Sequence, residues 1–148
     1  IKIIANMTGT TPTAWNDPVK GSELAKAQIS QGADVIYAAA GGTGVGVLQI
    51  AADEGILSIG VDSNQNHLHS GKVLTSMLKR VDVAVYNAMS AGADLETGGT
   101  TVLGLAEEGV AVAMDEHNEA LVTEEMTAAV ADARQKIIDG DITVPTEP

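Results

Sequence analysis

Residues 33–62 read ADVIYAAAGGTGVGVLQIAADEGILSIGVD, and this stretch decides the fold class. Residues 33–40 are nearly continuous in apolar side chains, which predicts a central parallel strand that is buried on both faces. Glycines at positions 41, 42 and 44 then predict a turn, and apolar residues recur at helical spacing until Gly55. Residues 56–61 predict the next strand, so the stretch forms one strand, helix, strand unit of a parallel sheet.

The segments on either side of this unit continue the alternation of helices and strands. Asp17 and Pro18 are residue types preferred at a helix N-cap and first turn, so we expect a helix from residue 18 to 31 that ends at Gly32. Thr123 is a second N-cap, for a helix that runs to residue 139. The other expected elements are a strand at 1–5, a strand or extended crossing at 73–77, a helix at 79–91, a hairpin of 102–105 with 110–113, and an edge strand at 142–144.

The composition fits a single α/β domain over residues 1–148. Hydrophobic residues make up 45% of the chain but aromatic residues only 2%, so Ala, Val, Ile, Leu and Met must fill the core. The formal net charge of −12 repels nucleic acids and anionic membrane surfaces, which excludes nucleic acid as a partner. The chain has no cysteine, which excludes disulfides and a thiol nucleophile, and its start at Ile1 is typical of a piece of a longer protein.

In an open parallel sheet the ligand lies beyond the carboxyl ends of the strands, and three predicted loops meet there. They are the loop that holds Trp15, the glycine turn at 41–44 and the loop at 62–66. The glycines let a ligand approach the backbone amides of the following helix, although such a turn also occurs without any ligand. Asp62 follows a buried strand directly, where its carboxylate can accept hydrogen bonds from both hydroxyls of a ribose or can cap the turn.

Other side chains near these loops allow both a functional and a structural interpretation. Trp15 is the only tryptophan, and it either stacks on a base or fills the edge of the core. Lys79 follows a strand and opens a helix, so it either binds a ligand or is a surface lysine. His67 and His69 lack a third ligand at metal-site spacing, and no serine stands in a nucleophile elbow, so we predict neither a metal nor a catalytic residue. The glycines follow G-x-G-x-G rather than the dinucleotide-binding G-x-G-x-x-G.

Three runs of sequence, in their order and spacing, resemble the basic membrane protein family. They are residues 33–55, IGVDSNQN at 59–66 and GKVLTSMLKRVDVAVYNA at 71–88. Members of that family are the substrate-binding lipoproteins of ABC importers for purine nucleosides, with a few relatives acting as regulators. They are type I periplasmic binding proteins with two α/β lobes. The resemblance covers nearly all 148 residues and implies that this chain is the second lobe, without the first.

The resemblance also implies roles for individual residues. Asp62 matches the aspartate that holds the ribose hydroxyls, and Lys79 matches a lysine that lines the same pocket. Trp15 lies where relatives carry an aromatic residue near the cleft. The turn whose backbone borders the ligand is matched by Gly41, Gly42 and Thr43. Family pockets often sandwich the base between phenylalanines, whereas this chain has no Phe, so stacking here needs Trp15 or the first lobe.

We therefore expect the carboxyl-terminal lobe of a periplasmic or lipid-anchored substrate-binding protein that captures a purine nucleoside or nucleobase by hinge closure. Its expected partners are that ligand, an ABC permease and the first lobe, and we expect neither catalysis nor a cofactor. If the helix at 79–91 has no first lobe to pack on, its exposed apolar side predicts self-association of the isolated lobe. The alternatives are a nucleotide-dependent α/β enzyme and a ligand-sensing regulatory domain of the same fold.

Overall fold

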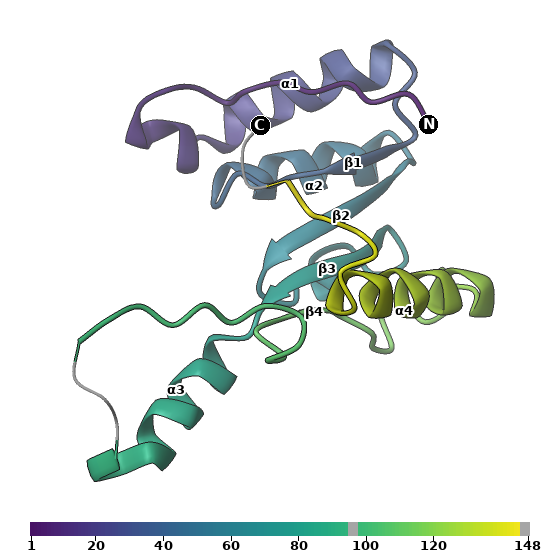
Figure 1. Ribbon diagram of the computed structural model, residues 1–148. Coiled ribbons are helices and arrows are strands. Elements are labelled where there is room, and N and C mark those ends of the chain that lie inside the picture. Colours follow the sequence, from purple (N-terminus) through teal and green to yellow (C-terminus); the bar gives the residue numbers. More distant parts are fainter. Residues whose placement is uncertain (95–97, 146–148) are drawn as a thin grey trace. The chain divides into compact units, whose positions relative to one another are not determined.

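In the computed structural model, which describes residues 1–94 and 98–145, the chain divides into two compact units (Figure 1). The first unit comprises Ile1–Leu78 and Val112–Leu121, and the second comprises Lys79–Ala111 and Val122–Pro148. None of the helices in the described part of the chain is both long and apolar enough to cross a membrane. The organisation of residues 1–148 as one lobe stays a prediction.

The first unit contains the strand, helix, strand arrangement that the sequence predicts. β1 (Val35–Tyr37), α2 (Thr43–Asp53) and β2 (Leu57–Asp62) follow one another, and β1 pairs with β2 in parallel. β3 (Val73–Lys79) lies on the other side of β2 and is also parallel to it. The prediction of an α/β fold with a mostly parallel sheet flanked by helices is therefore confirmed.

The fourth strand makes the sheet mixed. The strand order is β1-β2-β3-β4, where β4 is Val110–Val112. The N–H of Arg80 donates to Gly109 O and the N–H of Ala113 donates to Ser76 O, each at 2.9 Å. Because residue numbers rise along β4 as they fall along β3, β4 runs antiparallel to its neighbour.

Helix α1 (Pro18–Ser30) packs against α2, and the two helices cover one face of β1 (Figure 1). The carboxylate of Asp17 accepts a hydrogen bond from the N–H of Lys20 at 3.0 Å, which confirms the predicted N-cap. The chain leaves the helix through Gly32, which has φ 94°. Small side chains fill the core between these elements, as the composition requires: Ala25, Ile36, Ala38 and Val47.

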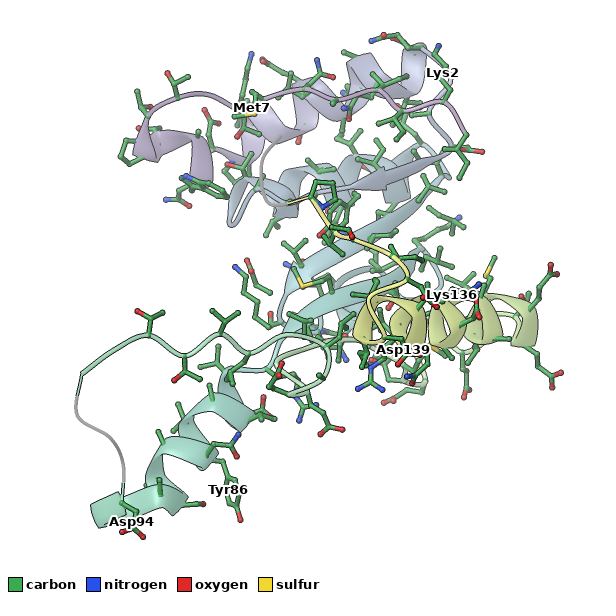
Figure 2. The ribbon with its side chains drawn as sticks, in the orientation of Figure 1. Lys2, Met7, Tyr86, Asp94, Lys136 and Asp139 are labelled. Carbon is green, nitrogen blue, oxygen red and sulfur yellow. The ribbon has the colours of Figure 1, made fainter. Side chains whose placement is uncertain are left out.

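The second unit contains helices α3 (Val81–Ala91) and α4 (Glu124–Ile138), with the short η3 (Gly92–Asp94) after α3. The hydroxyl of Thr123 accepts from the N–H of Met126 at 3.2 Å, so the second predicted N-cap is also confirmed. No residue of α3 is buried, and Figure 2 shows Tyr86 standing away from this helix. Self-association through this apolar helix stays a prediction.

The strand expected at 33–40 is shorter and less buried than predicted. Only Val35–Tyr37 forms β1, and this strand is the edge of the sheet instead of a central strand. Ile36 faces the helices, whereas the side chains of Val35 and Tyr37 are exposed. The apolar run predicted two covered faces, but the described residues place helices over only one of them.

The two strands predicted at the chain ends are wrong. Residues 1–5 are not a strand and lie beside α1, where the amide of Gln28 donates to Ile4 O at 3.1 Å (Figures 1 and 2). Residues 142–144 are also irregular, and the N–H of Ile142 donates to Lys136 O at the end of α4. Both segments have strand-like residues, but a strand also needs a partner for its backbone groups.

Two further predictions need correction. The hairpin of 102–105 with 110–113 does not form: residues 102–105 are not a strand, although Gly109 N–H donates to Gly104 O at 2.8 Å and closes a turn there. Only the second arm joins the sheet, as β4. Lys79 does not open the following helix, because it is the last residue of β3 and α3 begins at Val81.

Candidate functional site

The candidate site lies in the first unit, at the carboxyl ends of β1 and β2. The glycine turn follows β1 and Asp62 ends β2. Because these strands are parallel, both lie at the end of the sheet where the strands finish. This confirms the expected convergence of the two loops.

The loop that holds Trp15 contacts the glycine turn. Trp15 ends the short helix η1 (Pro12–Trp15), and a Cβ placed on Gly41 would lie 3.1 Å from Trp15 O and 3.5 Å from its ring atom Cε3. Gly41 has φ 56°, a conformation that glycine adopts without strain. Trp15 as a residue is 61% exposed, so it does not fill the core, and stacking of its ring on a base stays a prediction.

Thr43 is fully buried and joins the two loops through its side chain. Its hydroxyl donates to Ala14 O and accepts from the N–H of Asp17, both at 2.7 Å. Both hydrogen bonds of this hydroxyl are therefore internal. Because Thr43 as a whole is fully buried, Gly41 and Gly42 are the residues at the start of this turn that are open to solvent. Thr43 is also the first residue of α2, after the N-cap Gly42, so its N–H belongs to the helix end that favours anions and ligand acceptors.

Replacement of Thr43 by valine is expected to lower the free energy of unfolding by about 2 kcal/mol, because Ala14 O and the N–H of Asp17, one buried and one partly buried, lose their partner. Thr43→Ser, which keeps the hydroxyl, is the matched control and loses only a methyl group, about 1 kcal/mol. Urea denaturation of the two variants makes the comparison. Equal stabilities for Thr43→Val and Thr43→Ser would contradict the bridging role.

Asp62 and Lys79 end neighbouring strands. Asp62 pairs in register with Leu78 of β3, and Lys79 is the next residue of that strand and the first of the second unit. Asp62 is half-buried, and its φ of 69° is unusual for a residue with a side chain. Lys79 is exposed. Contact of either side chain with a ligand stays a prediction.

Sequence reasoning missed a polar network that fastens the loop after β2. The side-chain amides of Asn64 and Asn66 both donate to Oδ2 of Asp115, which lies about fifty positions further along the chain. The hydroxyl of Ser76 donates to Asn66 Oδ1 at 2.8 Å, and Asn66 and Ser76 are fully buried. Asn118, also fully buried, accepts from the N–H of Asp115 at 2.9 Å. The asparagines at 64 and 66 were the only local signal, because the partners are distant in sequence.

Hydrogen bonds to Asp115 also set its ionisation. The amide of Asn64, more than any other group, lowers the pKa of the Asp115 carboxyl below its usual value. The N–H of His117 and the amide of Asn66 act in the same direction, and desolvation opposes them. A charged Asp115 therefore suits its place as the common acceptor of this loop.

The histidines near this loop do not assemble a metal site in the described residues. The rings of His67, in η2 (Asn66–His69), and His117 lie 6.4 Å apart between centroids, and Nδ1 of His117 is 3.3 Å from Ser70 Oγ. Within residues 1–94 and 98–145, no three His, Asp or Glu side chains gather closely enough to hold a metal ion.

Several proteins are similar to this chain in sequence. A "CD4+ T-cell-stimulating antigen" of Listeria monocytogenes is 39% identical over 149 residues, which cover 87% of this chain and 40% of that protein. An "ABC transporter nucleoside-binding protein BmpA" of Lactococcus lactis is 34% identical over 154 residues, 90% of this chain and 42% of that protein. An uncharacterised lipoprotein of Pyrococcus abyssi is 36% identical over 117 residues, 74% of this chain and 28% of that protein. The chain thus spans less than half the length of each of these relatives.

A solved structure and a family model point to the same class of protein as these relatives. A solved solute-binding protein of an ABC transporter system from Aeropyrum pernix superposes with a TM-score of 0.75 at 29% identity, covering 95% of this chain and 46% of that one. The family model described as "ABC transporter substrate-binding protein PnrA-like" matches residues 1–147. The chain therefore belongs to the Bmp family of PnrA-like ABC transporter substrate-binding proteins.

Proposed function

We propose that this chain is one lobe of a two-lobe protein that captures a purine nucleoside or nucleobase for an ABC importer. The family is one of substrate-binding proteins rather than enzymes, and a relative from Lactococcus lactis is named a nucleoside-binding protein. The single observation that carries the proposal is the position of Asp62. Asp62 is the last residue of β2, and it lies at the same end of the sheet as the glycine turn and the exposed Trp15.

In this proposal each part of the site recognises a different part of the ligand. Asp62 accepts hydrogen bonds from the ribose hydroxyls, and Lys79 donates to an acceptor on the ligand. The backbone at Gly41 and Gly42 borders the ligand, Thr43 holds this turn from beneath, and the ring of Trp15 stacks on the base. These groups suit a neutral, flat ligand with a vicinal diol.

The proposal extends to the complete protein. The first lobe closes over the ligand by a hinge motion, and the closed form delivers it to an ABC permease. We place the protein in the periplasm or at the cell surface, because substrate-binding proteins work there and the relatives include lipoproteins.

Calorimetric titration of the full-length protein tests this function. We expect adenosine, guanosine or inosine to bind about a hundredfold more tightly than ribose, because the base adds stacking and hydrogen bonds. Uridine is the matched control for the size of the base. If adenine binds as tightly as adenosine, the ribose adds nothing to the affinity, and the proposed role of Asp62 is wrong. If none of the purine compounds binds, the proposed substrate class is wrong.

A further inference from the structure

Asp62 sits in a strained turn. The N–H of Ser63 donates to Val61 O at 2.9 Å, across Asp62, whose φ is 69°. A hydrogen bond between residues i and i+2 with a positive φ at the central residue defines a γ-turn that is rare and strained. A residue with a side chain keeps such a conformation only when its surroundings enforce it. Some neighbouring group must therefore hold this turn.

The regular ladder between β1 and β2 stops just before the turn. The N–H of Ala38 donates to Ile59 O at 3.4 Å, and in a regular parallel ladder the N–H of Val61 would then donate to Ala38 O. Ala38 O instead accepts from the N–H of Ala40 at 2.9 Å. The side chain of Gln65 takes its place, because Gln65 Oε1 accepts from the N–H of Val61 at 2.8 Å. A side chain thus replaces a strand at the residue that precedes Asp62.

The position of Gln65 is itself fixed from two sides. Its N–H donates to Ser76 Oγ at 3.0 Å, and the Ser76 hydroxyl in turn donates to Oδ1 of the buried Asn66. On the other side, a Cβ placed on Gly60 would lie 2.8 Å from Gln65 Oε1 and 2.7 Å from Ser76 Oγ. Gln65 therefore lies directly over Gly60, in a space that exists because that residue has no side chain.

We propose that Gln65 is a positioning residue, which holds the backbone of Asp62 in the conformation from which its carboxylate binds the ribose hydroxyls. Gln65 acts by accepting the hydrogen bond of Val61 N–H and does not touch the ligand itself. Without that acceptor the turn relaxes, and the Asp62 carboxylate leaves the place where it meets both hydroxyls. This inference rests on the proposed role of Asp62 and adds a specificity determinant to it.

The test replaces Gln65 by methionine in the full-length protein, which removes the oxygen acceptor and keeps the length of the side chain. We expect the Kd for a purine nucleoside to rise about tenfold and the Kd for the free nucleobase to stay unchanged, because only the ribose contact is lost. Gln65→Glu keeps an acceptor oxygen and is expected to restore nucleoside affinity to within about threefold of the parent. Gln31→Met, at an exposed glutamine of the same unit, is the matched control.

Two comparisons separate this inference from the proposed function. If Asp62→Ala weakens nucleoside binding but Gln65→Met does not, the positioning role is wrong and the function stands. If Asp62→Ala has no effect, the role of Asp62 fails and this inference fails with it. Equal losses for nucleoside and nucleobase in Gln65→Met would show a general structural role and overturn the inference. In the double variant of Asp62→Ala with Gln65→Met, we expect no loss beyond that of Asp62→Ala.

A second variant and a second readout cover the case in which Gln65→Met does not fold. Gln65→Asn shortens the side chain by one methylene, so its oxygen cannot reach Val61 N–H, and the same selective loss is expected. Amide hydrogen exchange of Val61 and Ser63 in the ligand-free protein is expected to accelerate in this variant but not in Gln65→Glu. Unchanged exchange at both amides would show that Gln65 does not hold the turn.

Discussion

Replacement of Asp62 by alanine is expected to weaken purine nucleoside binding by tenfold to a hundredfold in the full-length protein. Hydrogen bonds from two ribose hydroxyls to a carboxylate are charge-assisted, and their loss costs roughly 1.5–3 kcal/mol. The half-buried position of Asp62 strengthens the effect, because the ribose displaces solvent from a carboxylate already partly shielded from water. Calorimetric titration of the parent protein and of Asp62→Ala with the same purine nucleoside gives the change in Kd.

Ligand analogues make this prediction specific to the ribose. The parent protein is expected to bind the 2′-deoxynucleoside more weakly than the nucleoside. Asp62→Ala is expected to bind the two equally, because it lacks the carboxylate that accepts from the 2′-hydroxyl. Asp53→Ala, at an exposed aspartate near the end of α2, is the matched control and keeps both affinity and discrimination. Undiminished discrimination in Asp62→Ala would assign the diol contact to another residue.

Replacement of Gly46 by alanine is expected to lower the free energy of unfolding by about 3 kcal/mol, through a collision between α1 and α2. A Cβ on Gly46 would overlap Pro18 O and lie 2.7 Å from Pro18 C and 2.8 Å from Ser22 Oγ. The O and C atoms of Pro18 are backbone atoms of α1, so the collision cannot be relieved by rotating a flexible side chain. The two helices would have to move apart, and their common core with them.

The sign of this effect distinguishes packing from helix propensity. Alanine is favoured over glycine in an exposed helix by about 1 kcal/mol, so Gly46→Ala would stabilise the protein if the helices were not in contact. Gln49→Ala, one turn further along α2 at an exposed position, is the control and is expected to change stability little. Urea denaturation that finds Gly46→Ala as stable as the parent would contradict the close approach of α1 to α2.

The helices and the first parallel strand pair were predictable because their signals are local. The caps at Asp17 and Thr123 form hydrogen bonds to residues three positions away, so the residue types alone indicate them. The glycine turn after β1 and the strand that ends at Asp62 belong to one short unit of chain. The two loops of the candidate site could therefore be placed together, at the carboxyl ends of the parallel strands, from the sequence.

The failures concern strands and hydrogen-bond partners that are far apart. Residues 1–5 and 142–144 have strand-like composition, yet their backbone groups bond to α1 and to the end of α4 instead of to a neighbouring strand. The position of β1 at the edge of the sheet depends likewise on which strands pair, and no local pattern states that. Propensity describes the segment alone, whereas strand formation depends on a second segment.

The sequence by itself determined the family, the helices with their caps, and the parallel unit that carries Asp62 and the glycine turn. Only the tertiary structure decided how Asp62 is held. Its strained turn depends on Gln65 replacing a strand, on Ser76 of the next strand, and on Asp115 accepting from the loop across about fifty residues of chain. The reason is physical: a buried polar group must find a partner in space, and folding selects that partner without regard to distance along the chain.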